Sequence, residues 1–287
     1  MTSVLARAAS LTLETDPFPH LVIDDALDPD VYASLAAQFP GLDVVNYKGR
    51  RVRNNRLYQM PARAVEADPR ITAAWKAFFR YHVSIQFWRE ALPMLKSQLL
   101  TTCPDLEQIA GTRLEDFRAM VREKKHAPID TEISLECHFG INSPVIRPSS
   151  VRSPHLDHPK KIFNALLYCR LPEDDTPGGE LILYRRIAPL VYADGSSIMF
   201  TRIAEAKRIA YRANRLVLFL SSPWSVHGVA PRPKTPHVRR FVNFLCEFRQ
   251  PLFKLERLSL LSRYCESAGA AMRRRLSGRS EAIGQLV

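Results

Sequence analysis

The chain has 287 residues, of which 46% are hydrophobic and 24% charged, and this balance excludes collagenous, low-complexity and coiled-coil proteins. It carries 41 Lys and Arg against 29 Asp and Glu, so its formal net charge is +12. A positive field of this size favours anionic partners, whether nucleic acid, phosphorylated or carboxylated small molecules, or an anionic membrane surface.

The five cysteines are widely spaced and form no C-x-x-C pair, which argues against a disulfide framework or a zinc site. We therefore expect a reducing, cytoplasmic location. Residues 1–16 lack the sustained apolar run of a secretion signal, and no segment is apolar over the length that spans a membrane. We expect a soluble protein without a transmembrane segment, and its basic residues leave peripheral membrane contact open.

The first 125 residues are predicted to form an N-terminal strand and a mostly helical support region. The strand is expected over 17–24, and Asp28 followed by Pro29 marks the start of a helix that ends near residue 38. A basic loop over 48–56 precedes a long helical pattern over 71–100, which Pro93 is expected to kink or split. A further short helix is expected over 112–125.

The apolar pattern changes to a period of two in the region 126–250. Apolar residues alternate over 133–139 and over 242–248, and the short apolar runs between them are separated by turns rich in Gly, Pro and Asp. This pattern predicts an antiparallel sandwich or jelly roll. A helical pattern with a basic tail follows over 251–287. The predicted fold class is therefore α+β, with a jelly-roll (double-stranded β-helix) core, N-terminal supporting helices and a helical C-terminal tail.

The segment SPHLDHP places His155 and Asp157 two residues apart. On a strand, their side chains would point to one face, where an imidazole and a carboxylate can bind one metal ion. A second histidine from a distant strand completes the two-histidine, one-carboxylate set that holds non-haem Fe(II). His227 is the candidate because it follows the strongly apolar run NRLVLFL. Taken singly, each histidine reads as an ordinary strand-end residue, and it is the order of the motifs that favours the metal site.

This order of motifs resembles the iron(II)- and 2-oxoglutarate-dependent oxygenases, in particular the branch that contains the prolyl hydroxylases. PFPHLVIDDALDPDVYASLAAQFP is similar to the N-terminal strand and helix of that branch, HLDHPKKIFNALLYCRL to its first metal-binding strand, PGGELILY to its glycine turn and RLVLFLSSPWSVHGVAP to its distal-histidine segment. The similarity covers the start of the chain and residues 130–250. It implies a hydroxylase that uses Fe(II), 2-oxoglutarate and O2 and releases succinate and CO2, with His155, Asp157 and His227 as catalytic metal ligands.

The resemblance also implies a cation that binds the far carboxylate of 2-oxoglutarate from the strand after the distal histidine, where Arg239 and Arg240 both stand. Arg240 shares a strand face with alternate residues of 242–248, which form the more apolar set. We therefore predict that Arg240 points into the barrel and binds the carboxylate in a bidentate pair. Its position thirteen residues after His227 is further along than is usual in the family.

By the same parity, Tyr168 shares a face with Asn164 and Leu166, and it resembles the tyrosine whose hydroxyl contacts that carboxylate in the family. A core aromatic with a satisfied hydroxyl is the alternative. His158 is expected to point away from the metal and to face solvent or support the ligands. The remaining histidines are expected to be structural: His20, His82, His126, His138 and His237.

Asp157 favours hydroxylation, because the resemblance implies a small residue at this position in halogenases. Basic residues are expected near the mouth of the site, and they would suit a small or glycan-like substrate with a carboxylate or phosphate, unless they form only a solvated basic face. These residues are Arg147, Arg152, Lys160, Lys161, Arg185, Arg186, Arg232, Lys234 and Arg239. The alternatives are a prolyl hydroxylase acting on a protein or peptide, a non-catalytic jelly-roll binding module, and a cupin of other metal chemistry.

Nucleic acid is not the expected partner, because the demethylases of this superfamily carry a second arginine six residues after the first, where Leu245 and Cys246 stand here. Residues 71–125 have no counterpart in the resemblance. We expect them to form substrate-specific walls or the contact of a homodimer.

Overall fold

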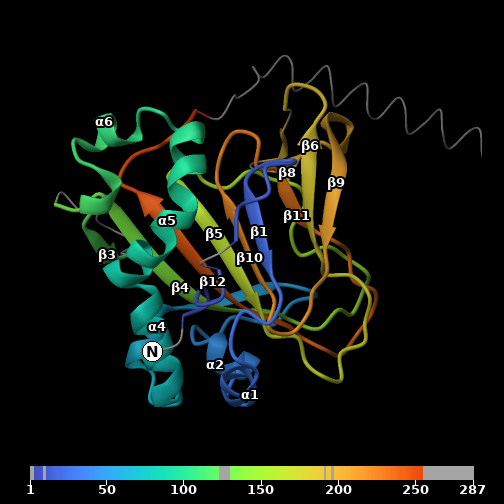
Figure 1. Ribbon diagram of the computed structural model, residues 1–287. Helices are drawn as coiled ribbons and strands as arrows, with labels where there is room; N and C mark the ends of the chain where they lie inside the picture. The colour runs from blue at the N-terminus through green and yellow to red at the C-terminus, as the bar shows by residue number, and fades with distance from the viewer. Residues whose placement is uncertain (1–2, 9–10, 123–129, 191, 195–196, 255–287) are drawn as a thin grey trace, which may run out of the picture.

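The computed structural model describes residues 3–8, 11–122, 130–190, 192–194 and 197–254 (Figure 1). The helices are α1 (Pro29–Ala37), α2 (Leu42–Val45), α3 (Ala62–Ala67), α4 (Ala73–His82), α5 (Ile85–Thr102) and α6 (Leu106–Ala110), with 3-10 turns at Leu114–Asp116 and Phe200–Arg202. The predicted C-terminal helix and tail lie beyond residue 254 and so outside the described residues. Among these residues, no helix combines the length and apolar character needed to cross a membrane.

The strands form one large sheet, one small sheet and a short β7–β8 pair. The large sheet has the order β1-β10-β5-β12-β4-β2, with β3 pairing parallel to β4, and the small sheet has the order β11-β6-β9. The strands are β1 (His20–Ile23), β2 (Leu57–Pro61), β3 (Ala119–Val121), β4 (Ile133–Asn142), β5 (Lys161–Tyr168), β6 (Leu181–Arg186), β7 (Tyr192–Asp194), β8 (Ser197–Ile198), β9 (Ile203–Ile209), β10 (Leu216–Leu220), β11 (His227–Val229) and β12 (Arg239–Phe248).

The two sheets face each other. Tyr168 and Phe219 of the large sheet pack in one buried cluster with Leu183 and Ile209 of the small sheet. We call the side of the large sheet that faces the small one its inner face, and the other side its outer face. The mixed α and β architecture, with antiparallel sheets over 133–248, agrees with the sequence prediction. The proposed domain boundaries at residues 125 and 250 stay a prediction.

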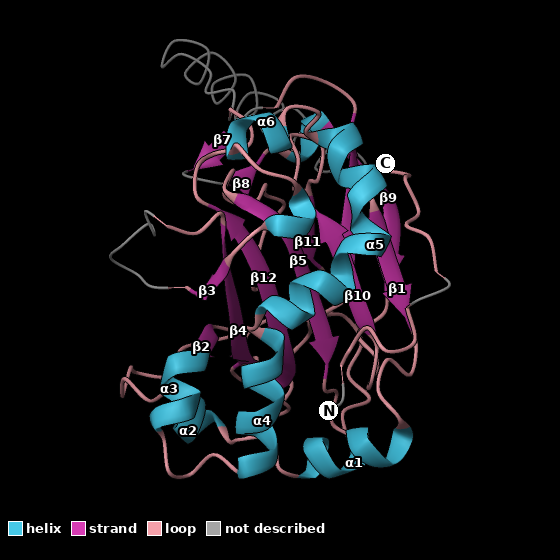
Figure 2. Ribbon diagram, turned by 60° about the vertical axis from the view of Figure 1, so that its left-hand side comes forward, coloured by secondary structure: helices cyan, strands magenta, loops and turns pink. Residues whose placement is uncertain are grey.

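Helices α4 and α5 cover the outer face of the large sheet, as Figure 2 shows. The ring of Trp75 on α4 lies 4.8 Å from that of Phe139 on β4, and Phe87 on α5 lies 6.0 Å from Phe244 on β12. Large apolar residues recur three and four positions apart on these helices, so one stripe of each is buried. This layer contains most of the hydrophobic core.

The N-terminal strand and the helix capped by Asp28 are confirmed, since Asp28 Oδ1 accepts a hydrogen bond from Asp30 N at 3.0 Å. The predicted split at Pro93 is wrong: Pro93 lies inside α5, and the long helical stretch is instead interrupted at Val83 and Ser84. Ser84 has extended dihedrals, and its hydroxyl donates to Tyr81 O at 2.7 Å. This local hydrogen bond replaces a helical one and lets the chain change direction.

The predicted helix over 112–125 is also wrong. The chain forms a single 3-10 turn at Leu114–Asp116 and then β3, and residues 123–129 are outside the described part. The Glu132 carboxylate accepts a hydrogen bond from Arg118 N at 2.8 Å just before β3 pairs with β4. The backbone of this segment is therefore satisfied by the sheet rather than by a helix.

Candidate metal centre

His155, Asp157 and His227 come together although the first two do not lie on a regular strand. Each offers one ligand atom, and these atoms all lie within 4.8 Å of one another. His155 forms an isolated antiparallel bridge with His227, the first residue of β11, and their ring centroids are 4.4 Å apart. The bridge, rather than alternation along a strand, brings the two imidazoles together. All three side chains are buried.

Both imidazoles are held with the same nitrogen turned away from the cluster. Nδ1 of His155 lies 2.9 Å from Ser153 O, and Nδ1 of His227 lies 2.9 Å from Ser225 O. Because a carbonyl oxygen only accepts, each Nδ1 carries the proton and each Nε2 presents its lone pair. Burial lowers the pKa of both imidazoles, which favours the neutral form that binds metal.

Asp157 is oriented by two residues of β5. Its Oδ1 accepts from Lys161 Nζ at 2.8 Å, and its Oδ2 accepts from Asn164 Nδ2 at 3.3 Å and lies 3.9 Å from His227 Nε2. Burial raises the pKa of Asp157, but the charge of Lys161 and its hydrogen bond to the carboxylate act in the opposite direction, and the net pKa lies well below its ordinary range. The cluster therefore offers an ionised carboxylate and two neutral imidazoles, which is the donor set for non-haem iron.

Sequence reasoning missed these supporting contacts. From the sequence, Lys161 is predicted only to be one of the basic residues near the mouth of the site. Asn164 is predicted only to share a strand face with Tyr168. The signal available was the spacing, because Lys161 and Asn164 follow Asp157 by four and seven residues at the start of the next strand.

Arg239 lies between the two sheets and is only 2% exposed. Its guanidinium stands 5.0 Å from the Tyr168 ring and 4.8 Å from the Tyr211 ring, and its Nε donates to Gly179 O at 2.9 Å. Gly179 has a φ of +80°, and a Cβ there would lie 3.2 Å from Arg239 Cδ. The glycine turn therefore allows this close approach.

One nitrogen of this guanidinium, Arg239 Nη2, is buried and has no hydrogen-bond partner among the described residues, and the same is true of the nearby Tyr168 hydroxyl. Burial raises the pKa of Tyr168, and the nearby charge of Arg239 offsets part of that rise, so the hydroxyl keeps its proton. Both atoms are thus donors in need of an acceptor. A carboxylate supplies such an acceptor.

The prediction that Arg240 points into the barrel is wrong. Its Nε donates to Cys169 O at 3.0 Å, and its guanidinium stands 5.0 Å over the ring of Phe39, which belongs to the core cluster of the outer face. The parity was read correctly, since Tyr168 does face inward with Asn164. The more apolar set of β12 lies not inside but on the outer face, where α4 and α5 cover it.

The other predicted residues have varied surroundings. His158 is exposed and accepts from Lys160 N, whereas His82 and His20 are fully buried. His126 lies outside the described residues. Several of the basic residues have structural partners and do not form one rim: Arg232 pairs with Asp174 at 2.7 Å, and Arg185 pairs with Asp16 at 2.6 Å.

No family model matches the chain, and no curated protein matches it. Similar solved structures include prolyl 4-hydroxylases from Phytophthora capsici (18% identity, covering 89% of this chain and 68% of that chain, TM-score 0.43) and from Pseudomonas putida (14%, 80% and 93%, 0.38). Another is the epimerase SnoN in complex with Fe3+, alpha-ketoglutarate and nogalamycin RO (13%, 80% and 78%, 0.42). All three identities are below 25% and all three TM-scores below 0.5, so the chemistry of this chain has to be inferred from its own side chains.

Proposed function

We propose that this chain is an Fe(II)- and 2-oxoglutarate-dependent dioxygenase that hydroxylates an unactivated C–H bond, and that its two facing sheets are the jelly roll of that family. One observation carries the proposal. A buried two-histidine, one-carboxylate cluster and a buried guanidinium with an unpartnered nitrogen lie between the two facing sheets: His227 begins β11 of the small sheet, and Asn164, which holds Asp157, shares the inner face of the large sheet with Arg239. An enzyme that binds a metal and a dicarboxylate together needs both features.

In this proposal His155, Asp157 and His227 hold Fe(II) and leave coordination positions open for 2-oxoglutarate and O2. When bound, the metal and the cosubstrates supply the oxidising chemistry, with release of succinate and CO2. Lys161 and Asn164 fix the carboxylate of Asp157, and the two carbonyl partners fix the imidazoles. The ligands are therefore oriented before the metal binds.

Arg239 and Tyr168 bind the far carboxylate of 2-oxoglutarate, and Arg239 takes the role first assigned to Arg240. Register supports this assignment, because Tyr168 pairs with Phe241 on β12, and Arg239 lies two residues before Phe241 on the same face. Phe241 and Phe219 add apolar surface in the same buried cluster. They exclude water from the guanidinium and so strengthen its pair with a carboxylate.

The proposal is tested by anaerobic titration of the protein with Fe(II) and 2-oxoglutarate, followed by measurement of succinate in air. We expect stoichiometric iron binding, a visible charge-transfer band and slow succinate release without substrate. His227→Ala should lose all three. The matched control is His158→Ala, which removes a histidine next to the cluster and should keep them. The proposal is wrong if the wild type binds no iron, or if His227→Ala behaves like His158→Ala.

A further inference from the structure

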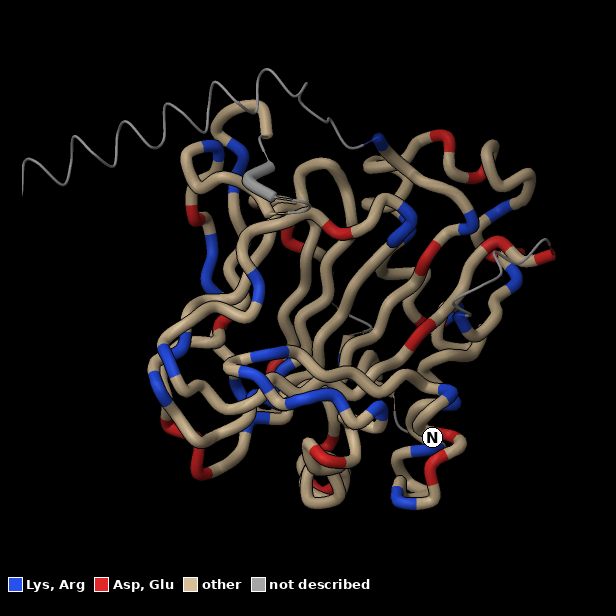
Figure 3. The backbone as a smooth tube through the Cα atoms, turned by 180° about the vertical axis from the view of Figure 1, so that it is seen from behind, with Lys and Arg blue, Asp and Glu red and all other residues tan. Residues whose placement is uncertain are grey.

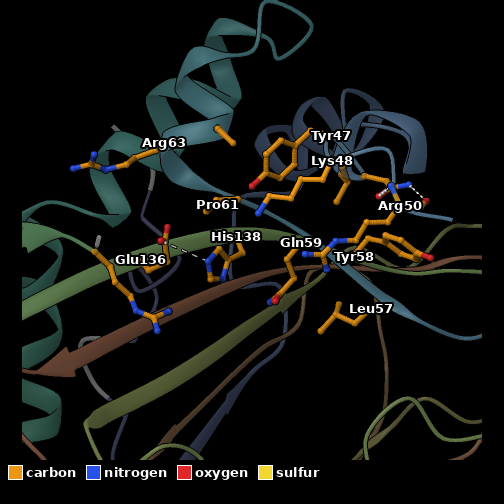
Figure 4. A pocket seen from close by; sticks show the side chains of 14 residues that line it. Tyr47, Lys48, Arg50, Leu57, Tyr58, Gln59, Pro61, Arg63, Glu136 and His138 are labelled. Atoms are coloured by element: carbon orange, nitrogen blue, oxygen red, sulfur yellow. Dashed lines mark hydrogen bonds and ion pairs between the residues drawn. The ribbon is translucent and has the colours of Figure 1, made fainter. Parts of the chain in front are cut away.

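A second feature of the inner face is a cleft of about 780 Å³ at the β2–β4 edge of the large sheet (Figure 4). Gln59 and Pro61 of β2 and Glu136 and His138 of β4 line it on the sheet side. The end of α2 and the loop after it line the other side, with Val45, Asn46, Tyr47, Lys48 and Arg50. Its volume lies in the range of small-molecule sites. None of the residues assigned above to the metal or to 2-oxoglutarate lines this cleft.

The cleft lies on the same face of the sheet as the candidate metal centre. Asn164, which donates to Asp157, pairs with Leu245 on β12, and Leu245 pairs with Glu136 on β4. Directly paired residues point to the same side of a sheet, and neighbouring strands are about 4.8 Å apart. Glu136 is therefore roughly 10 Å across the sheet from the residue that holds Asp157.

A line of unpartnered polar atoms crosses the sheet between the metal centre and the cleft. Asn164 Oδ1 on β5, Asn243 Oδ1 on β12 and His138 Nδ1 on β4 are buried and have no hydrogen-bond partner among the described residues. Asn164 is 7% exposed and Asn243 is 8% exposed. Buried polar atoms normally have partners, so three such atoms in a line point to a polar ligand.

Phe241 separates this line from the cosubstrate pocket. A Cβ at Gly140 would lie 2.5 Å from the Phe241 ring, so the ring occupies the space above this glycine of β4. Arg239 lies on one side of Phe241 along β12, and Asn243 lies on the other. Phe241 therefore lies between the Arg239 guanidinium and Asn243 on the inner face of β12.

The loop side of the cleft is positively charged. Lys48 and Arg50 extend from their loop over the cleft in Figure 4, and neither has an acidic partner in the described part of the chain. The acidic Glu136 is engaged below them, since its Oε1 accepts from Ala62 N and Cys137 N at 3.0 Å each. Figure 3 places Lys and Arg along the loops beside the sheet, while its strands are mostly uncharged. An anionic group is therefore attracted to the loop side of the cleft.

We propose that this cleft binds the substrate, and that the substrate is a small polar molecule with a phosphate or carboxylate group. The anionic group lies between Lys48 and Arg50, the polar middle contacts His138 and Asn243, and the carbon to be oxidised lies toward Asp157. This inference rests on the proposed function for the identity of the substrate, but the anion site can be tested without it.

The experiment uses the full chain and three matched probes: phenyl phosphate, benzoate and the neutral benzyl alcohol. Binding is measured by calorimetry on metal-free protein, and again by NMR on protein loaded with Mn(II) and 2-oxoglutarate. We expect at least one anion to bind ten-fold or more tightly than benzyl alcohol, and the tighter anion identifies the preferred group. The Lys48→Ala/Arg50→Ala variant should lose at least ten-fold in affinity for that anion. The control Lys76→Ala/Arg89→Ala removes the same charge from α4 and α5 and should stay within two-fold of wild type.

The outcomes separate the two proposals. If Mn(II) broadens the signals of the bound anion, the cleft and the metal centre are neighbours, as proposed. If the anion binds through Lys48 and Arg50 but Mn(II) does not bind the protein, the anion site stands and the dioxygenase proposal fails. If neither anion binds better than benzyl alcohol, or if the Lys48→Ala/Arg50→Ala variant binds like wild type, the cleft proposal is wrong whatever the metal does. Binding without broadening in Mn(II)-loaded protein contradicts a substrate site next to the metal.

Discussion

On the outer face of the large sheet, Phe163 and Phe244 pack against the aromatic residues of α4 and α5, and the His82 imidazole buried among them has a partner at each ring nitrogen. His82 Nδ1 lies 2.7 Å from Phe78 O, and its Nε2 accepts from Val4 N at 3.2 Å. On the inner face, by contrast, Arg239, Tyr168 and Asn243 leave buried atoms without partners. The difference indicates that the outer face stabilises the fold, whereas the inner face keeps polar atoms for ligands.

The largest expected effect is a loss of stability caused by a substitution on the outer face. Phe244→Ala removes a fully buried ring that contacts Phe78, His82 and Phe87, so we expect the free energy of unfolding to fall by about 3 to 5 kcal/mol. Urea denaturation measures this change. The affinity for 2-oxoglutarate of the fraction that stays folded should be unchanged. A loss of less than about 1 kcal/mol would contradict the division between the two faces.

The next largest effect is expected on the affinity for 2-oxoglutarate. It is tested at two neighbouring arginines on opposite faces of β12. Arg239→Met removes the only buried cation proposed to bind the far carboxylate, and we expect the Kd for 2-oxoglutarate to rise by about 30-fold or more. Arg240→Met is the matched control and should change the Kd by less than about 3-fold. Anaerobic titration of each variant with 2-oxoglutarate gives both values. The reverse order would restore Arg240 as the anchor.

The pH dependence of stability tests the satisfied polar group of the outer face. Burial lowers the pKa of His82 to about 3, below its ordinary value of 6.5. The folded state therefore binds fewer protons than the unfolded state, and the stabilisation from neutral His82 is complete above pH 6.5 and is lost as the pH falls. We expect a loss of about 1 kcal/mol between pH 7 and pH 5.5.

His82→Leu should remove this part of the pH dependence, while the contributions of other histidines remain. Urea denaturation of both proteins at the two pH values gives the difference. Equal slopes in the wild type and His82→Leu would show that His82 is already accessible to protons in the folded state.

The smallest expected effect on stability comes from a substitution on the inner face. Asn243→Leu replaces an amide whose Oδ1 has no partner, so the free energy of unfolding should stay the same or rise by up to about 1 kcal/mol. The same substitution should weaken binding of the preferred anion in the cleft. A loss of more than about 2 kcal/mol in stability would mean that Asn243 is a structural residue and that the two faces do not differ as described.

The local features could be predicted from the amino-acid sequence, because each depends on residues close together in the chain. Asp28 and Pro29 define the start of α1, and the alternating patterns define β4 and β12. The order of His155, Asp157 and His227 also identified the cluster that the fold brings together. The sequence established as well which residues share a face, as in the case of Tyr168 and Asn164, since side chains alternate along any strand.

Which of the two faces of β12 is turned inward depends on the packing of the two sheets and the helices. Alternation separates Arg239 from Arg240, but the helix-covered outer face is more apolar than the inner face, so hydrophobicity pointed to the wrong arginine. The interruption at Ser84, the pairing of β3 and the contact of Lys161 with Asp157 were likewise unpredictable, because each depends on distant backbone or on packing. The cleft beside β2 is of the same kind, since it is formed by segments about 80 residues apart in sequence, and residue spacing alone does not reveal such a contact.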